Sequence, residues 1–464
     1  MGRPKGSTKD ISKSTEVKRE VSMPVVHSYA AGIDVGSRSH FVAIGQGSDG
    51  VKEFGVYSED LHELCKWLKA AGIETVALES TGTYWQNLFL LLQDYALNPI
   101  LVNGRFTKNV QGKKTDVQDC QWIQKMHTMG LLPNSFQPDN FTEELRQYTR
   151  HRQYLIQAGA DYIKIMQKAL RMMNIRLDIA ISDVTGTSGK AIIQAIIAGQ
   201  TDPKELVKLA NYRIRKSKEE LESALTGEWK SQYVFELRHA YELYDVFQSK
   251  IEECDVAIAA LIEQKITQNE AQDGEQRPEF DKQGRKKKNK NAPEMDIEKL
   301  AFQLTGGIDL AKIDGVSGQT LLSIISEIGV DVSAFPSAKH FASWLHLSPN
   351  NKKTGGKVKS SHTPNKKNRI SLALQRAANV VGNNLKEGIL HQFFVRIKIK
   401  KGYMEAVVAT ARKIAVIIWH MLSKKEAFQP MENVVYQEKI KQQAIRNMQR
   451  KLKRLNIKPE ELVF

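Results

Sequence analysis

From Ser28 onward, short apolar runs alternate with amphipathic stretches, and this alternation leaves few possible folds. Three apolar runs separated by turn residues predict consecutive strands, and the segments after them alternate between helical and strand-like spacing. In chain order these segments are SYAAGIDVGS, HFVAIGQG, VKEFGVYS, the helical LHELCKWLKAAG, the strand IETVALE, the helical TYWQNLFLLLQDY and the strand NPILVN. This order predicts an α/β domain over 28–135, with a mixed sheet flanked by helices and a last helix starting near Thr115.

The middle of the chain, residues 136–267, has helical spacing almost throughout. Its clearest part is a seam of apolar residues in alternating steps of three and four, the heptad pattern of a coiled coil formed either within one chain or between chains. The seam consists of Leu237, Ala240, Tyr244, Phe247, Ile251, Cys254, Ile258 and Leu261. Residues 268–296, which include GRKKKNKNAP, are almost free of apolar residues and are predicted to form a disordered basic linker.

The charge balance points to a polyanionic partner. Lys and Arg number 68 against 52 Asp and Glu, a formal net charge of +16, and phosphate neutralisation dominates nucleic-acid affinity. The three cysteines are too few for a disulfide framework and favour a reducing, cytoplasmic compartment. No uncharged apolar run approaches the ~20 residues that cross a bilayer, and a helix at 403–422 contains Arg412 and Lys413, so no membrane partner is expected.

The two ends of the chain are polar and basic. Residues 1–27 are predicted to form a flexible basic arm, in which Gly2, Arg3 and Pro4 either resemble a minor-groove AT-hook or belong to a solvated tail. Residues 426–464 are predicted to contain a basic helix that either binds nucleic-acid backbone or is solvated.

A second globular, mostly helical unit is predicted over 297–425. Between Val332 and Lys386 it has no acidic residue, whereas a solvated surface usually mixes both signs, so this segment is a predicted nucleic-acid surface. Its basic residues are Lys339, Lys352, Lys353, Lys357, Lys359, Lys366, Lys367, Arg369, Arg376 and Lys386.

Four carboxylates lie at positions from which they could converge. Asp34 ends the first predicted strand and Glu79 the fourth, so both emerge at one end of the sheet if these strands are parallel neighbours. Asp116 and Asp119 are three residues apart, on one face of a helix near its start. Clustered acids raise one another's pKa unless cations neutralise them, and Mg²⁺ prefers oxygen ligands. The alternative is that each acid acts separately, as a turn residue, a cap or a helix N-terminal acid.

The motifs GIDVGS, ALESTGTYW and GKKTDVQDCQWI resemble the Asp, Glu, Asp, Asp motifs of the IS110-family transposases, the serine-type, RNA-guided bridge recombinases. The N-terminal domain of that family is similar to the RuvC resolvase and has an RNase H-like fold. The resemblance covers about 28–130 and 300–425. It implies that Asp34, Glu79, Asp116 and Asp119 form a catalytic tetrad that binds Mg²⁺, with Mn²⁺ as a substitute. It also implies donor and target DNA, a guide RNA, a dimer or tetramer, and association with the nucleoid.

In that family a serine directly before a glycine is the nucleophile, and the matching residue here is Thr354 in NNKKTGGKVKSS. Threonine keeps the hydroxyl but adds a methyl group that stiffens χ1. One alternative is that Ser360 or Ser361 is the nucleophile in place of Thr354. Another is that the protein has lost strand transfer, and a third is that KKTGGK only binds phosphate. The residues predicted to bind nucleic acid here are Lys352, Lys353, Lys357, Lys359, Lys366, Lys367 and Arg369.

A glycine-rich turn before this segment, with Gly315 and Gly318, could present backbone N–H groups to phosphate or could only form the turn. The function expected from all these features is cut-and-rejoin DNA recombination that moves an insertion sequence. No nucleotide-binding P-loop pattern is present, which agrees with a reaction that conserves bond energy without ATP. The alternatives are a RuvC-like structure-specific nuclease and a nucleic-acid-binding protein without catalysis.

Overall fold

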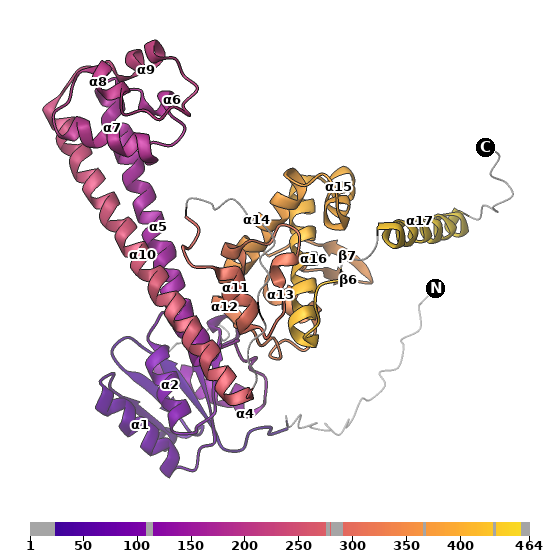
Figure 1. The fold of residues 1–464 in the computed structure, drawn as a ribbon. Coiled ribbons are helices and arrows are strands. Elements are labelled where there is room, and N and C mark those ends of the chain that lie inside the picture. Colours follow the sequence, from indigo (N-terminus) through magenta and orange to yellow (C-terminus); the bar gives the residue numbers. More distant parts are fainter. Residues whose placement is uncertain are drawn as a thin grey trace, which may run out of the picture. The chain divides into compact units, whose positions relative to one another are not determined.

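The computed structural model describes residues 24–107, 115–274, 279, 291–364, 368–429 and 433–455 (Figure 1). The chain divides into two compact units, Met1–Gln137 and Pro138–Phe464, and each is described by itself. The N-terminal arm with its Gly2-Arg3-Pro4 motif lies mainly outside the described residues, and Lys366 and Lys367 lie wholly outside them. The predicted linker, residues 268–296, is described only in part, and its first residues are helical rather than disordered, because the long helix before it continues to Asp273.

The first unit contains a sheet of five strands in the order β3-β2-β1-β4-β5. β1 pairs antiparallel with β2 and parallel with β4, and β4 pairs parallel with β5. The strands are β1 (Ala30–Val35), β2 (His40–Ala43), β3 (Val51–Phe54), β4 (Thr75–Glu79) and β5 (Pro99–Val102). This order and direction are those of an RNase H-like sheet, so the predicted fold class is confirmed.

Helices cover both faces of this sheet. The first face packs against α1 (Ser58–Ala70) and α2 (Trp85–Asp94), and its core includes Ile33, Leu64 and Leu88. The second face packs against α4 (Asp116–Thr128) through a smaller cluster that includes Ala77 and Ile123. Because side chains alternate along a strand, Asp34 and Glu79 belong to the face that α4 covers. A 3-10 turn (Ser48–Gly50) and α3 (Gly104–Thr107) complete the described elements of this unit.

The second unit begins with an antiparallel coiled coil formed within the chain by α5 (Asn140–Met172) and α10 (Ser231–Asp273). Most of the predicted seam is buried, but beyond Ile258 the buried positions are Ile262 and Ile266, and the predicted Leu261 is only partly buried. The seam shifts by one residue because an undistorted helix has 3.6 residues per turn and drifts relative to a strict heptad.

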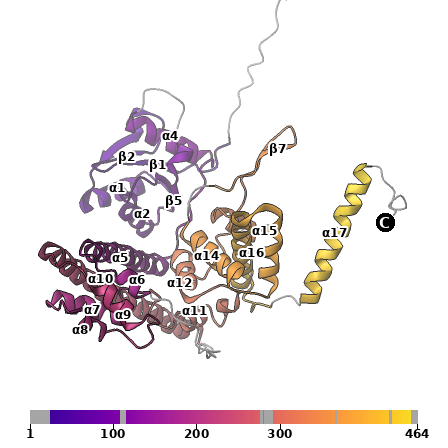
Figure 2. The same cartoon turned by 90° about the horizontal axis from the view of Figure 1, so that it is seen from above.

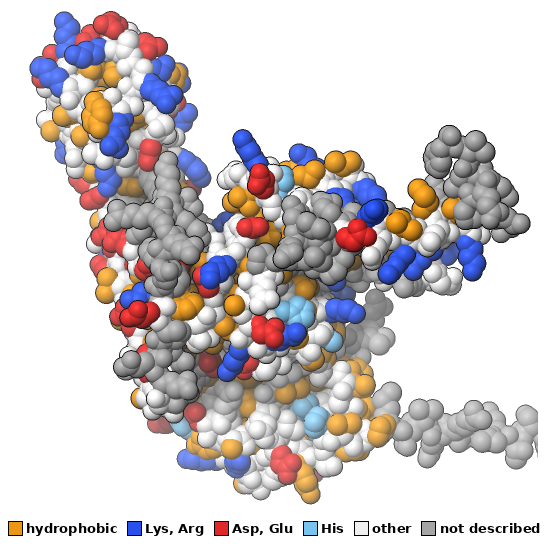
Figure 3. Space-filling view, turned by 45° about the vertical axis from the view of Figure 1, so that its right-hand side comes forward, with side chains coloured by type: hydrophobic (Ala, Val, Ile, Leu, Met, Phe, Trp, Pro, Cys, Tyr) orange, Lys and Arg blue, Asp and Glu red, His pale blue; other side chains and the backbone are white. Residues whose placement is uncertain are grey.

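A small helical head joins α5 to α10 at one end of the coiled coil (Figure 1). Its core, in which Ile193, Leu206 and Leu225 are buried, is continuous with the adjoining ends of α5 and α10. Its helices are α6 (Leu177–Ala180), α7 (Thr187–Ile197), α8 (Pro203–Val207) and α9 (Lys218–Leu225). Figure 3 shows acidic and basic side chains intermixed over the head, which is typical of a solvated surface.

The remainder of the second unit is mostly helical, as predicted. Figure 2 shows a two-stranded hairpin that projects away from its helices. The elements are α11 (Ile297–Leu304), a 3-10 turn (Leu310–Lys312), α12 (Gly318–Ile328), α13 (Ala338–Trp344), β6 (Lys352–Thr354), β7 (Lys357–Ser360), α14 (Arg369–Asn383), α15 (Ile389–Lys401), α16 (Tyr403–Lys424) and α17 (Asn433–Leu455).

α16 is the one described helix whose length and apolar composition would suffice to cross a membrane. It packs against α13, α14 and α15, and Ala411, Ile414 and Ile418 are almost completely buried. α16 is therefore the central core helix of this region. α17 differs, because its side chains at Ile445, Met448, Arg450 and Lys453 are exposed.

Candidate active site

Three of the four predicted carboxylates come together in the first unit. Asp34 lies near the end of β1, and Asp116 and Asp119 lie in the first turns of α4. One carboxylate oxygen of each lies within 4.8 Å of those of the other two. Asp34 and Asp119 are partly buried and Asp116 is exposed, so the group opens to solvent on one side.

The start of α4 fixes the two helical acids. The Thr115 hydroxyl caps the helix by accepting a hydrogen bond from the backbone N–H of Gln118 at 3.3 Å. Asp116 and Asp119 therefore lie at the positive end of the helix dipole, where negative charge is favourable. The sequence pattern T-D-x-x-D predicts both features, because threonine is a preferred N-cap residue.

Gly32 allows α4 to lie directly on the sheet beside Asp34. A Cβ at this position would be 2.2 Å from the backbone nitrogen of Gln124 and 2.6 Å from the carbonyl oxygen of Cys120. The Gln124 side chain also donates a hydrogen bond to the Ala30 carbonyl at 3.2 Å. The close contact between β1 and α4 thus places Asp116 and Asp119 next to Asp34.

Glu79 lies outside the group of three. β1 and β4 are parallel with Ile33 opposite Leu78, so the next residues, Asp34 and Glu79, are neighbours across the two strands on the same face. The Glu79 carboxylate accepts a hydrogen bond from the Thr107 hydroxyl of α3. The structure therefore brings the backbone of Glu79 to the site, while its side chain is directed to α3.

The chemistry of the three grouped residues fits a hard divalent cation. All three offer carboxylate oxygens, the ligands that Mg²⁺ and Mn²⁺ prefer. The nearby Cys120 is buried, and burial together with the negative charge of Asp34 raises the pKa of its thiol to about 12. The thiol thus stays protonated, and only oxygen ligands are available from these residues.

The predicted nucleophile loop is a β-hairpin. Gly355 and Gly356 have φ angles of 55° and 74°, and two residues with positive φ form the turn type that matches the twist of a tight hairpin. Thr354 is the last residue of β6, pairs with Lys357 and is exposed. Ser360 pairs with Lys352 and is partly buried. The sequence predicts this segment only as a loop, although the Gly-Gly pair could have indicated a hairpin.

The predicted nucleic-acid-binding residues have different environments. Lys352, Lys357 and Lys359 are exposed on the hairpin, and Lys353 lies in β6. Arg369 starts α14, and its Nε lies 3.8 Å from a carboxylate oxygen of Glu327.

Glu327 was missed in the sequence because it precedes the acid-free segment and belongs to an apolar helix. It is 8% exposed and forms ion pairs with Arg146 and Arg150 of α5 as well as Arg369. A single glutamate within the run LLSIISEIG could have indicated a buried acid that needs cationic partners.

The glycine-rich turn is closely packed. Gly315 has a φ of 81°, and a Cβ there would lie 2.5 Å from the Ala377 carbonyl oxygen of α14. Gly318 is the first residue of α12, which Ser317 caps by accepting a hydrogen bond from the N–H of Thr320 at 3.4 Å. At Gly315, both the backbone conformation and the close approach require glycine.

Two family models match the chain in the regions that carry these groups. The DEDD model of IS110, described as a transposase, matches residues 31–175, which contain all four carboxylates. The model described as the transposase IS116/IS110/IS902 family matches residues 309–391, which contain Thr354. No curated protein matches the chain. A DEDD nuclease-like domain implies the use of divalent metal, in agreement with the carboxylate group. The two matches confirm what the motifs predicted: the chain belongs to the IS110 family of transposases.

Proposed function

We propose that this transposase cuts and rejoins DNA by phosphoryl transfer at a divalent metal site. Asp34, Asp116 and Asp119, with Glu79, hold the cations, and the Thr354 hydroxyl is the nucleophile. The observation that carries the proposal is the grouping of three carboxylate oxygens within 4.8 Å, supplied by a strand and a helix far apart in the sequence. A charge cluster of this kind is costly to a fold unless it binds cations.

Mg²⁺, or Mn²⁺ in its place, would supply positive charge at the phosphoryl oxygens of the scissile DNA linkage. Asp34 holds its carboxylate at a strand end, while Asp116 and Asp119 hold theirs on the first turns of a capped helix. Glu79 completes the set by rotating away from the Thr107 hydroxyl, because its backbone already lies beside that of Asp34.

The hairpin is suited to deliver a hydroxyl to DNA. Thr354 is exposed next to the turn, and the ammonium groups of Lys352, Lys357 and Lys359 can attract the phosphates on either side of the scissile one. An Oγ–P bond forms as one P–O ester bond of the DNA breaks, and the threonine proton ends on the released strand hydroxyl. Attack by a strand hydroxyl reverses the step and rejoins DNA, so the number of ester bonds is conserved.

A guide RNA recognises the DNA sequence by pairing with donor and target DNA. The protein works as a dimer or tetramer in the nucleoid. Family resemblance supports these proposals. The basic, acid-free segment between Val332 and Lys386 also supports a role in holding nucleic-acid backbones. The coiled coil pairs α5 with α10 of the same chain, so its heptad seam is already occupied and an oligomer would need other surfaces.

The test is a covalent-adduct assay. The protein is incubated with Mg²⁺ and a plasmid that carries its own coding region with the flanking DNA and any RNA transcribed from it. A protein–DNA adduct is expected for the wild type and for Thr354→Ser, and none for Thr354→Ala or Asp34→Ala. Ser360→Ala, in the paired strand of the same hairpin, is the matched control and should retain the adduct.

The other outcomes identify the alternatives. An adduct that disappears in Ser360→Ala but persists in Thr354→Ala would move the nucleophile to Ser360. DNA hydrolysis that Thr354→Ala leaves unchanged, without any adduct, would establish a RuvC-like nuclease instead. Binding that survives Asp34→Ala, with no cleavage by the wild type under Mg²⁺ or Mn²⁺, would establish a binding protein without catalysis.

A further inference from the structure

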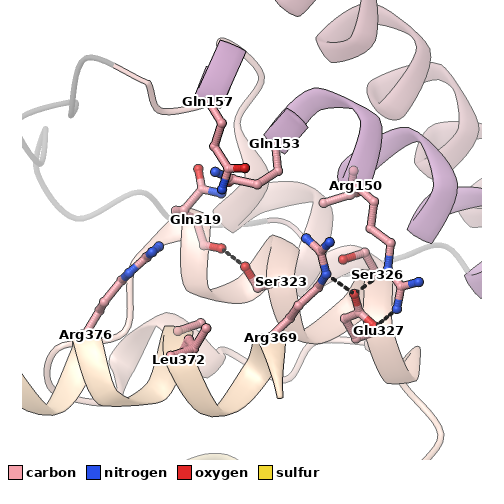
Figure 4. A pocket seen from close by; sticks show the side chains of 12 residues that line it. Arg150, Gln153, Gln157, Gln319, Ser323, Ser326, Glu327, Arg369, Leu372 and Arg376 are labelled. Atoms are coloured by element: carbon pink, nitrogen blue, oxygen red, sulfur yellow. Dashed lines mark hydrogen bonds and ion pairs between the residues drawn. The ribbon is translucent and has the colours of Figure 1, made fainter. Parts of the chain in front are cut away.

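A cavity of about 120 Å³, lined mainly by polar and charged residues, lies in the second unit between α5 on one side and α12 and α14 on the other. Figure 4 shows its side chains facing one another: Gln153 and Gln157 from α5, Gln319 from α12, and Arg376 from α14. About 10 to 15 Å³ of such space suffices for one water molecule, so this cavity admits a group with several oxygens, although not a base pair.

The cavity carries excess positive charge. Arg150, Arg369 and Arg376 line it, and Glu327 is the one acidic residue among the lining residues. The Glu327 carboxylate accepts hydrogen bonds from Arg150 Nε at 3.0 Å and Nη2 at 2.8 Å, so its charge is already compensated. Arg369 and Arg376 both belong to the acid-free segment. An anion that enters the cavity therefore meets cations and no uncompensated carboxylate.

The polar walls are elongated and follow two helices. Arg150, Gln153 and Gln157 are spaced three and four residues apart along α5, and Arg369 and Arg376 are seven apart on α14. Both spacings keep side chains on one helix face over about two turns. Two facing rows of donors fit a linear anion better than a compact one.

Ion pairs fix one wall of the cavity. Arg146 and Arg150 both reach Glu327 from α5, and Arg146 Nη2 also donates to the Glu327 carbonyl at 2.6 Å. Burial lowers the pKa of Arg150, but the hydrogen bonds with Glu327 outweigh burial and hold the pKa above its ordinary value. Within the described part of the chain, the Thr149 hydroxyl is buried in the same wall without a hydrogen-bond partner.

We propose that this cavity binds the phosphodiester backbone of a single-stranded nucleic acid, with Arg376 and Arg369 on the phosphates and the glutamines and Thr149 on sugar or base. Arginine suits this role because its planar guanidinium donates two parallel hydrogen bonds to a phosphate. The strand can be RNA or DNA, since both share the phosphodiester, but RNA also offers a 2′-hydroxyl to the amide and hydroxyl acceptors. The site requires neither the carboxylate group nor Thr354.

The test measures binding of fluorescent oligouridine and oligothymidine to the full chain by anisotropy, in EDTA. Arg376→Ala should weaken binding about tenfold, as the loss of one charge-assisted hydrogen bond predicts, and should lower the salt slope by roughly 0.7. Arg376→Lys, which keeps the charge but not the guanidinium, should fall between the wild type and Arg376→Ala. The matched control is Arg171→Ala, the same charge change on an exposed part of α5 outside the cavity.

A second measurement locates the bound oligonucleotide on the protein. Photocrosslinking with 4-thiouridine or 4-thiothymidine oligonucleotides should label peptides from 149–157 or 319–327, and Arg376→Ala should remove this label. Effects with oligouridine alone, oligothymidine alone or both would each support the cavity and identify its ligand. Equal binding by Arg376→Ala and Arg171→Ala, or labelling confined to other peptides, would overturn the proposal. Because EDTA removes divalent cations, a failure of the proposed catalysis would leave this result unaffected.

Discussion

Arg152 and Asp255 form a bidentate ion pair inside the coiled coil, with Arg152 on α5 and Asp255 on α10. The arginine Nε donates to Asp255 Oδ1 at 2.5 Å and its Nη2 donates to Oδ2 at 3.1 Å. Their exposed fractions are 2% and 5%. Arg152 also donates to the Asn291 carbonyl at 3.3 Å, so the pair attaches the segment before α11 to the coiled coil.

Removal of one partner should destabilise the second unit strongly. Asp255→Ala leaves a buried guanidinium uncompensated and should lower the free energy of unfolding by about 3 to 5 kcal/mol in denaturant titration. Asp161→Ala, which breaks an exposed pair with Lys164 on the same helix as Arg152, should change it by less than about 1 kcal/mol.

The double variant Arg152→Met with Asp255→Leu tests why Asp255→Ala lowers the free energy of unfolding. Because the penalty comes from an unpaired buried charge, the double variant should recover most of the lost stability. If it were as unstable as Asp255→Ala, the pair itself would supply net stability, and our account of the single variant would be wrong.

Most of the fold could be predicted because its patterns are local. The alternation of apolar runs after Ser28 gave all five strands of the sheet and the helices between them, and the heptad steps gave α10. The partner of α10 could not be predicted, because periodicity shows an apolar seam without showing what covers it. α5 covers it, and Leu155 and Met166 are among the buried residues that it contributes to the clusters shared with α10.

The site was only partly predictable. The spacing of Asp116 and Asp119 and the strand ends at Asp34 and Glu79 predicted a common location. Parallel pairing of β1 with β4 puts the ends of both strands at one edge of the sheet, and the side chains of Asp34, Asp116 and Asp119 are grouped there. Side-chain direction depends on contacts that no spacing reveals, such as the hydrogen bond from Thr107 to Glu79. Two arginine partners of Glu327, Arg146 and Arg150, were equally hidden, because they come from α5, far away in the sequence.

Gly32→Ala should separate α4 from the sheet. The new Cβ would meet the backbone of Gln124 at 2.2 Å, and backbone cannot yield as a flexible side chain does. We expect a loss of unfolding free energy of about 3 kcal/mol or more and a loss of activity, because α4 carries Asp116 and Asp119.

Gly45→Ala is the matched control, since a Cβ there meets nothing within 4 Å. It should change stability by about 1 kcal/mol or less. Thermal unfolding of both variants, with calorimetry of Mn²⁺ binding, checks this prediction. A Gly32→Ala protein with wild-type stability and metal affinity would show that α4 is not held by close contact at this glycine.

His127 should make the first unit sensitive to mild acid. Burial lowers its pKa to about 4, with the nearby His27 adding to the effect, and its Nε2 lies 3.0 Å from the Thr75 hydroxyl. The folded state therefore resists protonation that the unfolded chain accepts below about pH 6.5, so stability falls as the pH drops from 6.5 towards 4. The loss between pH 7.5 and pH 5 should be about 2 kcal/mol.

The variant His127→Gln cannot gain a proton and should lose that part of the pH dependence, whereas His62→Gln, at an exposed position, should retain it. Denaturant titrations at both pH values measure the difference. An identical pH slope in His127→Gln and the wild type would assign the acid sensitivity to other groups, such as His40, whose pKa burial also lowers.

Asp116→Asn should change stability in opposite directions with and without divalent cations. In EDTA the substitution removes repulsion from Asp34 and Asp119, whose oxygens lie within 4.8 Å, and each such pair costs about 1 kcal/mol even in water-like surroundings. The loss of a favourable helix-dipole interaction, about 0.3 to 1 kcal/mol, is smaller, so the melting temperature should rise. With Mn²⁺ the wild type gains binding energy that the variant has lost, so the wild type should then have the higher melting temperature.

Asp49→Asn, outside the group, should show neither effect. If Asp116→Asn remains more stable than the wild type at every Mn²⁺ concentration, these carboxylates do not bind the metal. A bound cation would attract all three carboxylates and would therefore stabilise the wild type more than the variant.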